Sequence, residues 1–249
     1  MMEDTLAEGA VDVIAMARGL IADPDFPLKA RQGKDGDINR CLRCYQCFSE
    51  LLDTRQFCCA INPVIGRELE NKFDTTRYDR KKVLLAGGGI GGMQAAPEAA
   101  KRGHEVVLVE KTGRLGGALL CEEKVSFKKN LDLYLSAQAR RVMEHPGVEV
   151  RLNTEATKEL AEGIAPDAIN AALGARPVIP SFIPGYDKTN VAGAEEVYYN
   201  LTKAGKKVVI LGGLAGCELG IHLALNGRNV TIFEMASTRI SQEICFMAK

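Results

Sequence analysis

Cysteines are concentrated in one short stretch of this chain, at a spacing suited to metal chemistry. Cys41, Cys44 and Cys47 follow one another at intervals of three residues, and the adjacent pair Cys58 and Cys59 comes later. Three thiolates in one loop, with a fourth returning from further along the chain, suit a cubane iron–sulfur cluster. The spacing therefore predicts a [4Fe–4S] site on the first three cysteines and one member of the later pair.

Two other interpretations of the cysteines are open, namely a zinc site and unligated thiols in a core. Zinc sites usually pair two separate C-x2-C knuckles, whereas here three cysteines share one loop, which favours the cluster. The remaining cysteines are scattered and are interpreted as small buried side chains: Cys121, Cys217 and Cys245. The histidines share no motif with a nucleophile, and none is assigned to catalysis: His104, His145 and His222.

A glycine-rich turn follows an apolar run downstream of the cysteines. Gly87, Gly89 and Gly92 form the pattern G-x-G-x-x-G. The first glycine allows a tight turn, the second lets a pyrophosphate approach the backbone, and the third allows a helix to pack closely on a strand. The helix N-terminus then faces the phosphates. The pattern predicts a dinucleotide site, and the structural alternative is a glycine turn that binds nothing.

Residues at the end of the next apolar run extend this prediction. Glu110 stands where a carboxylate can hydrogen-bond a ribose diol and repel a 2′-phosphate. Gly116 and Gly117 follow it and would let the chain lie close to a ligand, and Arg114 is expected to meet a phosphate or a flavin edge. The alternative for this segment is a simple surface turn.

A second β–α–β unit begins at Lys207. Its turn has two consecutive glycines before the helix, where the first turn has three. Its glycines are Gly212, Gly213 and Gly216. Either Leu211 occupies the first glycine position, or one residue of the turn is missing. Glu234 closes the second strand of this unit and favours NAD over NADP. Two copies of the unit predict two dinucleotide sites.

The apolar pattern predicts the elements that position these residues. Strands are expected at 11–16, 83–86, 105–109, 148–152, 167–172, 208–211 and 229–233. Helices are expected at 28–32, 48–53, 91–102, 128–144 and 216–226. Pro97 is expected to kink its helix, because proline removes a backbone hydrogen bond. Residues 62–80 are expected to form a linker.

The composition is that of a soluble globular protein. The chain has 249 residues, of which 46% are hydrophobic and 26% charged. Lys+Arg and Asp+Glu both count 32, so no nucleic-acid or membrane-surface partner is expected. The chain has no Trp, which argues against a stacking platform for bases. Without a signal peptide or an apolar span, a cytoplasmic location with reduced thiols is expected.

Taken together, these residues resemble the old-yellow-enzyme-like iron–sulfur flavoenzymes, the NADH:flavin oxidoreductase family that includes 2,4-dienoyl-CoA and 2-enoate reductases. Family members have an FMN-binding TIM barrel, a four-cysteine loop holding [4Fe–4S], and an FAD domain with an inserted NAD(P)H domain. The segments that carry the resemblance are 16–24, 41–47, 59–63, 66–68, 87–92, 114–117 and 172–177.

The resemblance implies roles for individual residues. It selects Cys59 over Cys58 as the fourth cluster ligand, because Cys59 opens a C-A-x-N-P element. It implies that Arg18 contacts the FMN phosphate after the eighth barrel strand. It also implies FAD at the first glycine turn with Glu110 and Arg114, and NADH at the second turn.

The implied fold class is α/β, with four parts along the chain. Residues 1–40 are expected to be the last strand of the TIM barrel, and 41–80 the iron–sulfur loop and linker. Residues 81–190 are expected to form an incomplete Rossmann-like FAD domain, and 191–249 an incomplete NAD(P)H-binding Rossmann domain. Barrel strands one to seven are absent, so the chain is expected to be an internal fragment of a much longer enzyme.

The implied activity is NADH-dependent oxidoreduction. Electrons would pass from NADH through FAD and [4Fe–4S] to FMN, and then to an activated C=C bond in a small enoate or enoyl-CoA substrate. Two alternatives are open: a non-catalytic truncated fragment that binds FAD and the cluster, and a zinc-binding protein with a nucleotide fold. The sequence leaves open whether the chain forms a homo-oligomer.

Overall fold

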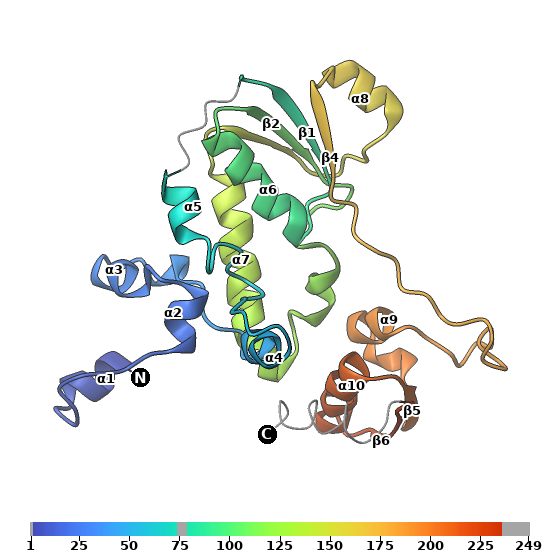
Figure 1. Ribbon diagram of the computed structural model, residues 1–249. Helices are drawn as coiled ribbons and strands as arrows, with labels where there is room; N and C mark the ends of the chain where they lie inside the picture. Colours follow the sequence, from blue (N-terminus) through green and yellow to red (C-terminus); the bar gives the residue numbers. More distant parts are fainter. Residues whose placement is uncertain (1, 74–78, 236–249) are drawn as a thin grey trace. The chain divides into compact units, whose positions relative to one another are not determined.

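The computed structural model describes residues 2–73 and 79–235 (Figure 1). Contacts divide the chain into two compact units, residues 1–75 and 76–249. Cys245 and the end of the expected 191–249 domain lie outside the described residues. No helix in the described ranges is long and apolar enough to cross a membrane.

The first unit consists of short helices joined by long loops. Its helices are α1 (Met2–Ala7), α2 (Arg18–Ala22), α3 (Phe26–Arg31), η1 (Asp35–Asp37), α4 (Gln46–Asp53) and α5 (Glu68–Phe73). The helices expected at 28–32 and 48–53 are confirmed by α3 and α4. The expected linker at 62–80 is wrong in part, because α5 begins within it.

The strand expected at 11–16 is wrong, because this segment is irregular. A barrel strand obtains its backbone hydrogen bonds from neighbouring strands, and residues 2–73 contain none. Val13 is 80% exposed, so the apolar run does not bury itself either. The loops that follow are held instead by buried Asp23, which accepts hydrogen bonds from Lys29 Nζ at 2.7 Å and from Asn39 N at 2.8 Å.

The second unit begins with a four-stranded, fully parallel sheet in the order β3-β2-β1-β4. The strands are β1 (Lys82–Ala86), β2 (Glu105–Val109), β3 (Val148–Arg151) and β4 (Ala168–Ala171). Helices α6 (Ile90–Lys101) and α7 (Lys129–Met143) cover one face, and α8 (Lys158–Ile164) covers the other (Figure 1). This α/β layering is that of a Rossmann-like domain.

Burial explains why these runs form strands and helices. Leu84, Val107 and Val109 pack beneath Ile164 of α8, and parallel strands covered on both faces read as continuous apolar runs. Helix α6 is continuous through Pro97, whose side chain is fully buried. The 3-10 helices η2 (Gly117–Glu122) and η3 (Ser126–Lys128) lead from the sheet into α7.

A second parallel pair of strands follows later in the same unit. Strands β5 (Lys207–Leu211) and β6 (Asn229–Phe233) form the pair. The helices of this segment are α9 (Ala194–Tyr199), η4 (Leu201–Lys203) and α10 (Leu214–Leu225). Val197, Ile210, Leu219 and Leu223 form its core.

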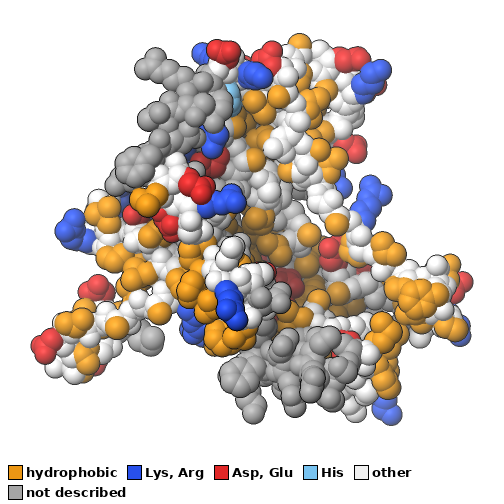
Figure 2. Space-filling view, in the orientation of Figure 1, with side chains coloured by type: hydrophobic (Ala, Val, Ile, Leu, Met, Phe, Trp, Pro, Cys, Tyr) orange, Lys and Arg blue, Asp and Glu red, His pale blue; other side chains and the backbone are white. Residues whose placement is uncertain are grey.

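On the face seen in Figure 2, positive and negative side chains are scattered rather than gathered by sign.

The sheet topology creates one edge suited to ligand binding. Because the strands are parallel, Gly87, Glu110 and Ala172 follow the carboxyl ends of β1, β2 and β4. The chain moves from β1 to β2 and β3 on one side and returns to β4 on the other. In open α/β sheets, ligands bind at such a reversal of strand order.

Candidate cofactor-binding sites

Two glycines of the first turn are required by the protein's own packing. Gly87 has φ +108°, and a Cβ there would collide with the carbonyl oxygen of Ala172. A Cβ on Gly92 would collide with the carbonyl oxygen of Gly87. The turn and the first turn of α6 therefore approach each other as closely as backbones can.

Gly89 differs from these two, because no protein atom prevents a side chain there. Its backbone is extended (φ −72°, ψ −173°), and the nearest atom to an added Cβ is Gly117 Cα, at 3.9 Å. Gly89 is also the N-cap of α6, with no capping side chain on the helix. A side chain would thus fit at Gly89, directly before a helix N-terminus whose first N–H groups need acceptors.

Glu110 is buried beside this turn and holds it in place. The carboxylate is 7% exposed; Oε2 accepts a hydrogen bond from Gly88 N at 2.7 Å. Oε1 accepts bonds from Thr112 N and Oγ1, both at 2.9 Å. Burial raises the pKa of Glu110, but the bonds from Thr112 and Gly88 outweigh it and hold the pKa below its usual value. The sequence analysis missed Thr112, although a hydroxyl two residues after a strand-end carboxylate is a recognisable signal.

The lowered pKa of Glu110 predicts a pH-dependent stability. The stability it confers is complete above the pKa of glutamate in an unfolded chain, about 4.3, and is lost as the pH falls through the lower folded pKa. Glu110→Gln should lower the free energy of unfolding at pH 7 and flatten its decline between about pH 5 and 3. Urea unfolding at several pH values measures this, with Glu155→Gln at an exposed position as the control. Equal pH slopes in all three proteins would contradict the assignment.

The second pair of glycines packs directly on the first turn. Gly116 (φ +132°) donates its N–H to Gly88 O at 2.8 Å. A Cβ on Gly117 would lie 2.9 Å from Gly89 Cα. Gly116 and Gly117 therefore form a wall of the space before Gly89.

Arg114 does not point freely toward this space. Its Nη1 and Nη2 atoms donate to the two carboxylate oxygens of Glu123 at 3.1 and 2.8 Å. The expected contact with a phosphate or flavin edge therefore requires this ion pair to open. Leu173, in the segment expected near the flavin, is 71% exposed.

The second glycine turn can be aligned with the first by its hydrogen bonds. Gly212 N donates to Phe233 O at 3.1 Å, as Gly87 N donates to Val109 O at 2.9 Å. Both glycines thus follow the first strand and bond to the last residue of the second. Because Leu211 is the last residue of β5, it does not occupy a glycine position.

The helix side of the turn fixes where the missing residue belongs. Gly213 is the N-cap of α10, as Gly89 is the N-cap of α6. The third glycine, Gly216, follows its cap at the same spacing as Gly92. One residue is therefore missing from the second turn, at the position of Gly88.

The four cysteines selected from the sequence line one small cavity of the first unit. The lining includes Cys41, Cys44, Cys47 and Cys59 but not Cys58. Cys58 Sγ instead lies 4.0 Å from Gln46 O. Burial raises the pKa of the Cys59 thiol, and backbone N–H groups of Ile61 and Asn62 partly offset this effect.

The backbone around the cavity has an uncommon conformation. Arg43 and Tyr45, which alternate with the cysteines, have φ values of +60° and +57°. A positive φ costs a residue other than glycine of order 1 kcal/mol or more. Residues with this backbone conformation cluster at functional sites. Arg18 also lines the cavity, with its guanidinium 4.7 Å from the centre of the Tyr45 ring.

The segment after Cys59 is anchored by its asparagine. Asn62 Nδ2 donates to Ile21 O at 2.8 Å, and Asn62 Oδ1 accepts from Val64 N at 3.2 Å. Within the described ranges, no three His, Cys, Asp or Glu side chains meet closely enough to hold a single metal ion. The four thiols thus share a cavity without converging on one point.

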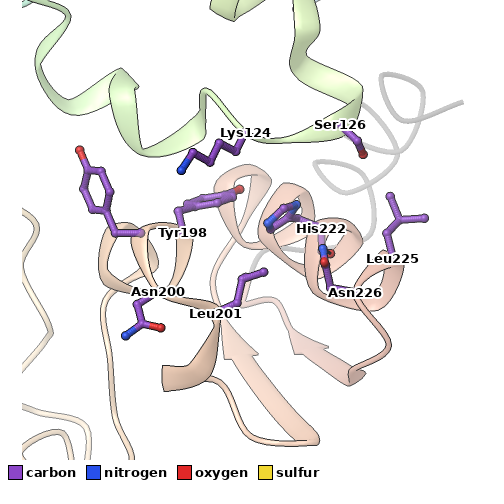
Figure 3. Close-up of a pocket in the computed structure, with 9 residues that line it drawn as sticks. Lys124, Ser126, Tyr198, Asn200, Leu201, His222, Leu225 and Asn226 are labelled. Carbon is purple, nitrogen blue, oxygen red and sulfur yellow. Dashed lines mark hydrogen bonds between the residues drawn. The ribbon is translucent and has the colours of Figure 1, made fainter.

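A further cavity of about 550 Å³ lies beside the C-terminal half of α10 (Figure 3). Tyr198 of α9 and His222 of α10 line it, together with Lys124 and Ser126. Tyr198 Oη and His222 Nδ1 are buried and have no hydrogen-bond partner among the described residues. Because this cavity lies at the end of α10 opposite to Gly213, it is separate from the glycine turn.

Comparison with known proteins gives a consistent set of similarities. Residues 81–244 match the model of the family described as pyridine nucleotide-disulphide oxidoreductase. The chain is 40% identical over 245 residues to an NADH oxidase of Thermoanaerobacter brockii, covering 94% of this chain and 37% of that protein. It is 38% identical over 237 residues to a cinnamate reductase of Clostridium sporogenes, covering 94% of this chain and 35% of that protein.

A solved structure extends the similarity across both units. A 2-naphthoyl-CoA reductase in complex with 2-naphthoyl-CoA is 30% identical, with a TM-score of 0.81. The match covers 98% of this chain and 39% of that chain. The chain thus spans little more than a third of the length of the relatives it matches.

Proposed function

The chain belongs to the pyridine nucleotide-disulphide oxidoreductase family, and from this premise we propose that it is the FAD- and cluster-binding segment of an NADH-dependent flavin oxidoreductase. The main support is the first glycine turn, where a Cβ would fit on Gly89 and the buried, ionised Glu110 holds the neighbouring Gly88. The pyrophosphate is proposed to bind at Gly89 and the N-terminus of α6, where an added Cβ would meet no atom closer than 3.9 Å. Glu110, whose carboxylate already accepts bonds from Gly88 and Thr112, is proposed to accept a further one from an adenosine ribose.

The chain's residues divide the work of holding FAD. Gly87 and Gly92 shape the turn, Gly116 and Gly117 form its wall, and Glu110 fixes the turn through Gly88 N. FAD, when bound, accepts a hydride and can release electrons singly. Arg114 joins the site only after releasing Glu123.

The cysteine cavity is proposed to hold a [4Fe–4S] cluster on Cys41, Cys44, Cys47 and Cys59. The four thiols line one cavity, and three of them share one loop, which favours a multi-iron cluster over zinc, whose sites usually pair two C-x2-C knuckles. Backbone N–H groups beside Cys59 and Cys41 would stabilise charge on the sulfur atoms. Such a cluster supplies one-electron transfer between flavins.

The remaining parts of the proposal follow the relatives. Cinnamate and 2-naphthoyl-CoA are the compounds in the relatives' names, so the full protein is proposed to reduce an unsaturated carboxylate or CoA thioester. FMN would be held mainly outside this chain, with Arg18 contributing. The four parts proposed along the chain are the barrel end at 1–40, the iron–sulfur loop and linker at 41–80, the FAD domain at 81–190 and the NAD(P)H domain at 191–249. NADH is proposed to bind at the second turn, with Glu234 among its contacts.

Selective flavin binding tests the proposal at the first turn. Glu110 and Gly89 are proposed to recognise the adenosine ribose and the pyrophosphate of FAD, and FMN lacks the adenosine monophosphate part of this group. FAD is therefore expected to bind with a stoichiometry of one, and FMN should not displace it. Flavin fluorescence quenching measures both. Failure to bind FAD, or equal binding of FMN, would contradict the proposed site.

A further inference from the structure

The two glycine turns differ at one position, and that position controls where a carboxylate lies. In the first turn, Gly88 separates Gly87 from Gly89. Its N–H holds Glu110 Oε2 at 2.7 Å. The carboxylate is thereby fixed beside the middle residue of the turn, and the space before Gly89 stays open, with 3.9 Å between an added Cβ and the nearest atom.

The second turn has no middle residue, and its carboxylate lies close to the glycine that caps the helix. Glu234 Oε2 lies 3.0 Å from the position of a Cβ on Gly213. Gly213 is equivalent to Gly89, the glycine that a pyrophosphate has to approach. A Cβ would therefore fit on this glycine in the first turn, whereas in the second turn it would meet a carboxylate oxygen.

This contact sets two negative groups against each other. A pyrophosphate that enters the second turn approaches Glu234, and like charges within a few ångströms repel each other, although solvent weakens the repulsion because Glu234 is exposed. The N-terminus of α10, a helix of 12 residues capped only by Gly213, still provides N–H donors for a phosphate. The site keeps its phosphate donors but gains a competing charge.

We propose that the missing residue of the second turn holds the nicotinamide-dinucleotide site of this chain in a low-affinity form, by placing Glu234 against Gly213. The inference rests on the proposed function and concerns only its NADH site. FAD binding at the first turn is unaffected. Glu234 then changes from a ribose partner into an obstacle to the pyrophosphate.

A glycine insertion between Gly212 and Gly213 tests this directly. The probe is ADP-ribose, which carries the ribose and pyrophosphate but cannot transfer a hydride, titrated calorimetrically into the FAD-loaded chain. The insertion is expected to tighten binding by about tenfold or more. A control insertion after Gly227, where φ is +75° and no atom lies within 4 Å of an added Cβ, should leave binding unchanged.

Glu234→Gln provides a second readout with opposite signs. In the native turn the substitution should tighten ADP-ribose binding, because it removes the repulsion. In the insertion variant it should weaken binding, because Glu234 again serves the ribose. The inference is overturned if the native chain binds ADP-ribose as tightly as the insertion variant, or if neither binds it. FAD retention in the same samples shows separately whether the proposed FAD site has failed.

Discussion

Cys59→Ser is expected to prevent assembly of the iron–sulfur cluster, whereas Cys58→Ser should leave it intact. Cys59 lines the cavity shared with Cys41, Cys44 and Cys47, and Cys58 does not. A serine hydroxyl is a harder, poorer ligand for iron than a thiolate. Iron and acid-labile sulfide should fall from about four per chain to a small fraction in Cys59→Ser after anaerobic reconstitution.

The adjacent cysteines make this comparison well matched, because both variants change one thiol to a hydroxyl within the same loop. Circular dichroism before reconstitution checks that both retain the helices of the first unit. Loss of iron in Cys58→Ser, with full iron in Cys59→Ser, would reverse the assignment of the fourth ligand. Full iron in both variants would show that neither residue is a required ligand, and equal loss in both would contradict the distinction between them.

Gly89→Ala is expected to weaken FAD binding strongly without unfolding the protein. The protein leaves room for the methyl group, since the nearest atom is 3.9 Å away, and the extended backbone accepts alanine. The methyl group instead occupies the space proposed for the pyrophosphate. A steric conflict of about 1–3 kcal/mol weakens binding by roughly 10- to 100-fold. Flavin fluorescence titration measures the affinity, and thermal unfolding of the flavin-free chain measures the fold.

Neighbouring glycines supply the controls for this prediction. Gly91→Ala places its methyl group 3.8 Å from Ala172 Cβ, an ordinary contact, so both FAD affinity and stability should be retained. Gly92→Ala collides with the carbonyl oxygen of Gly87 and should destabilise the flavin-free chain itself. If Gly89→Ala binds FAD as tightly as Gly91→Ala, the pyrophosphate does not lie before Gly89.

The sheet of the second unit could be predicted from sequence because burial on both faces leaves a strong pattern. Leu84 and Val107 lie in continuous apolar runs, and parallel strands of this kind need such runs. The glycine fingerprint then indicated that β1, α6 and β2 form a parallel β–α–β unit. Helices α8 and α9 were missed because each spans only six or seven residues and shows little periodicity.

Other features depend on partners that a linear pattern does not specify. The run at 11–16 has the composition of a strand, but strand formation requires a neighbour, and none is present among residues 2–73. Arg114 was expected to bind a phosphate because its side chain is a cation. In the structure it forms an ion pair with Glu123 instead. The position of the missing turn residue became clear only from the bonds of Gly212 and the cap at Gly213.

The cysteine spacing illustrates how far sequence reasoning extends. It predicted three ligands from their shared loop but left Cys58 and Cys59 equivalent until the resemblance to the C-A-x-N-P element separated them. The structure adds a physical distinction between these two residues, because Cys59 lines the cavity and Cys58 does not. Asn62, in the same element, ties this segment to Ile21, a contact that no spacing rule predicts.

The central claim is that one chain holds both an iron–sulfur cluster and FAD. Its most direct test is the content of iron, acid-labile sulfide, zinc and flavin in a single sample reconstituted anaerobically and freed of unbound cofactors. The account predicts about four iron, about four sulfide and one FAD per chain, with no zinc. A chain that retains zinc or takes up no iron, or one that holds iron without FAD, would contradict it.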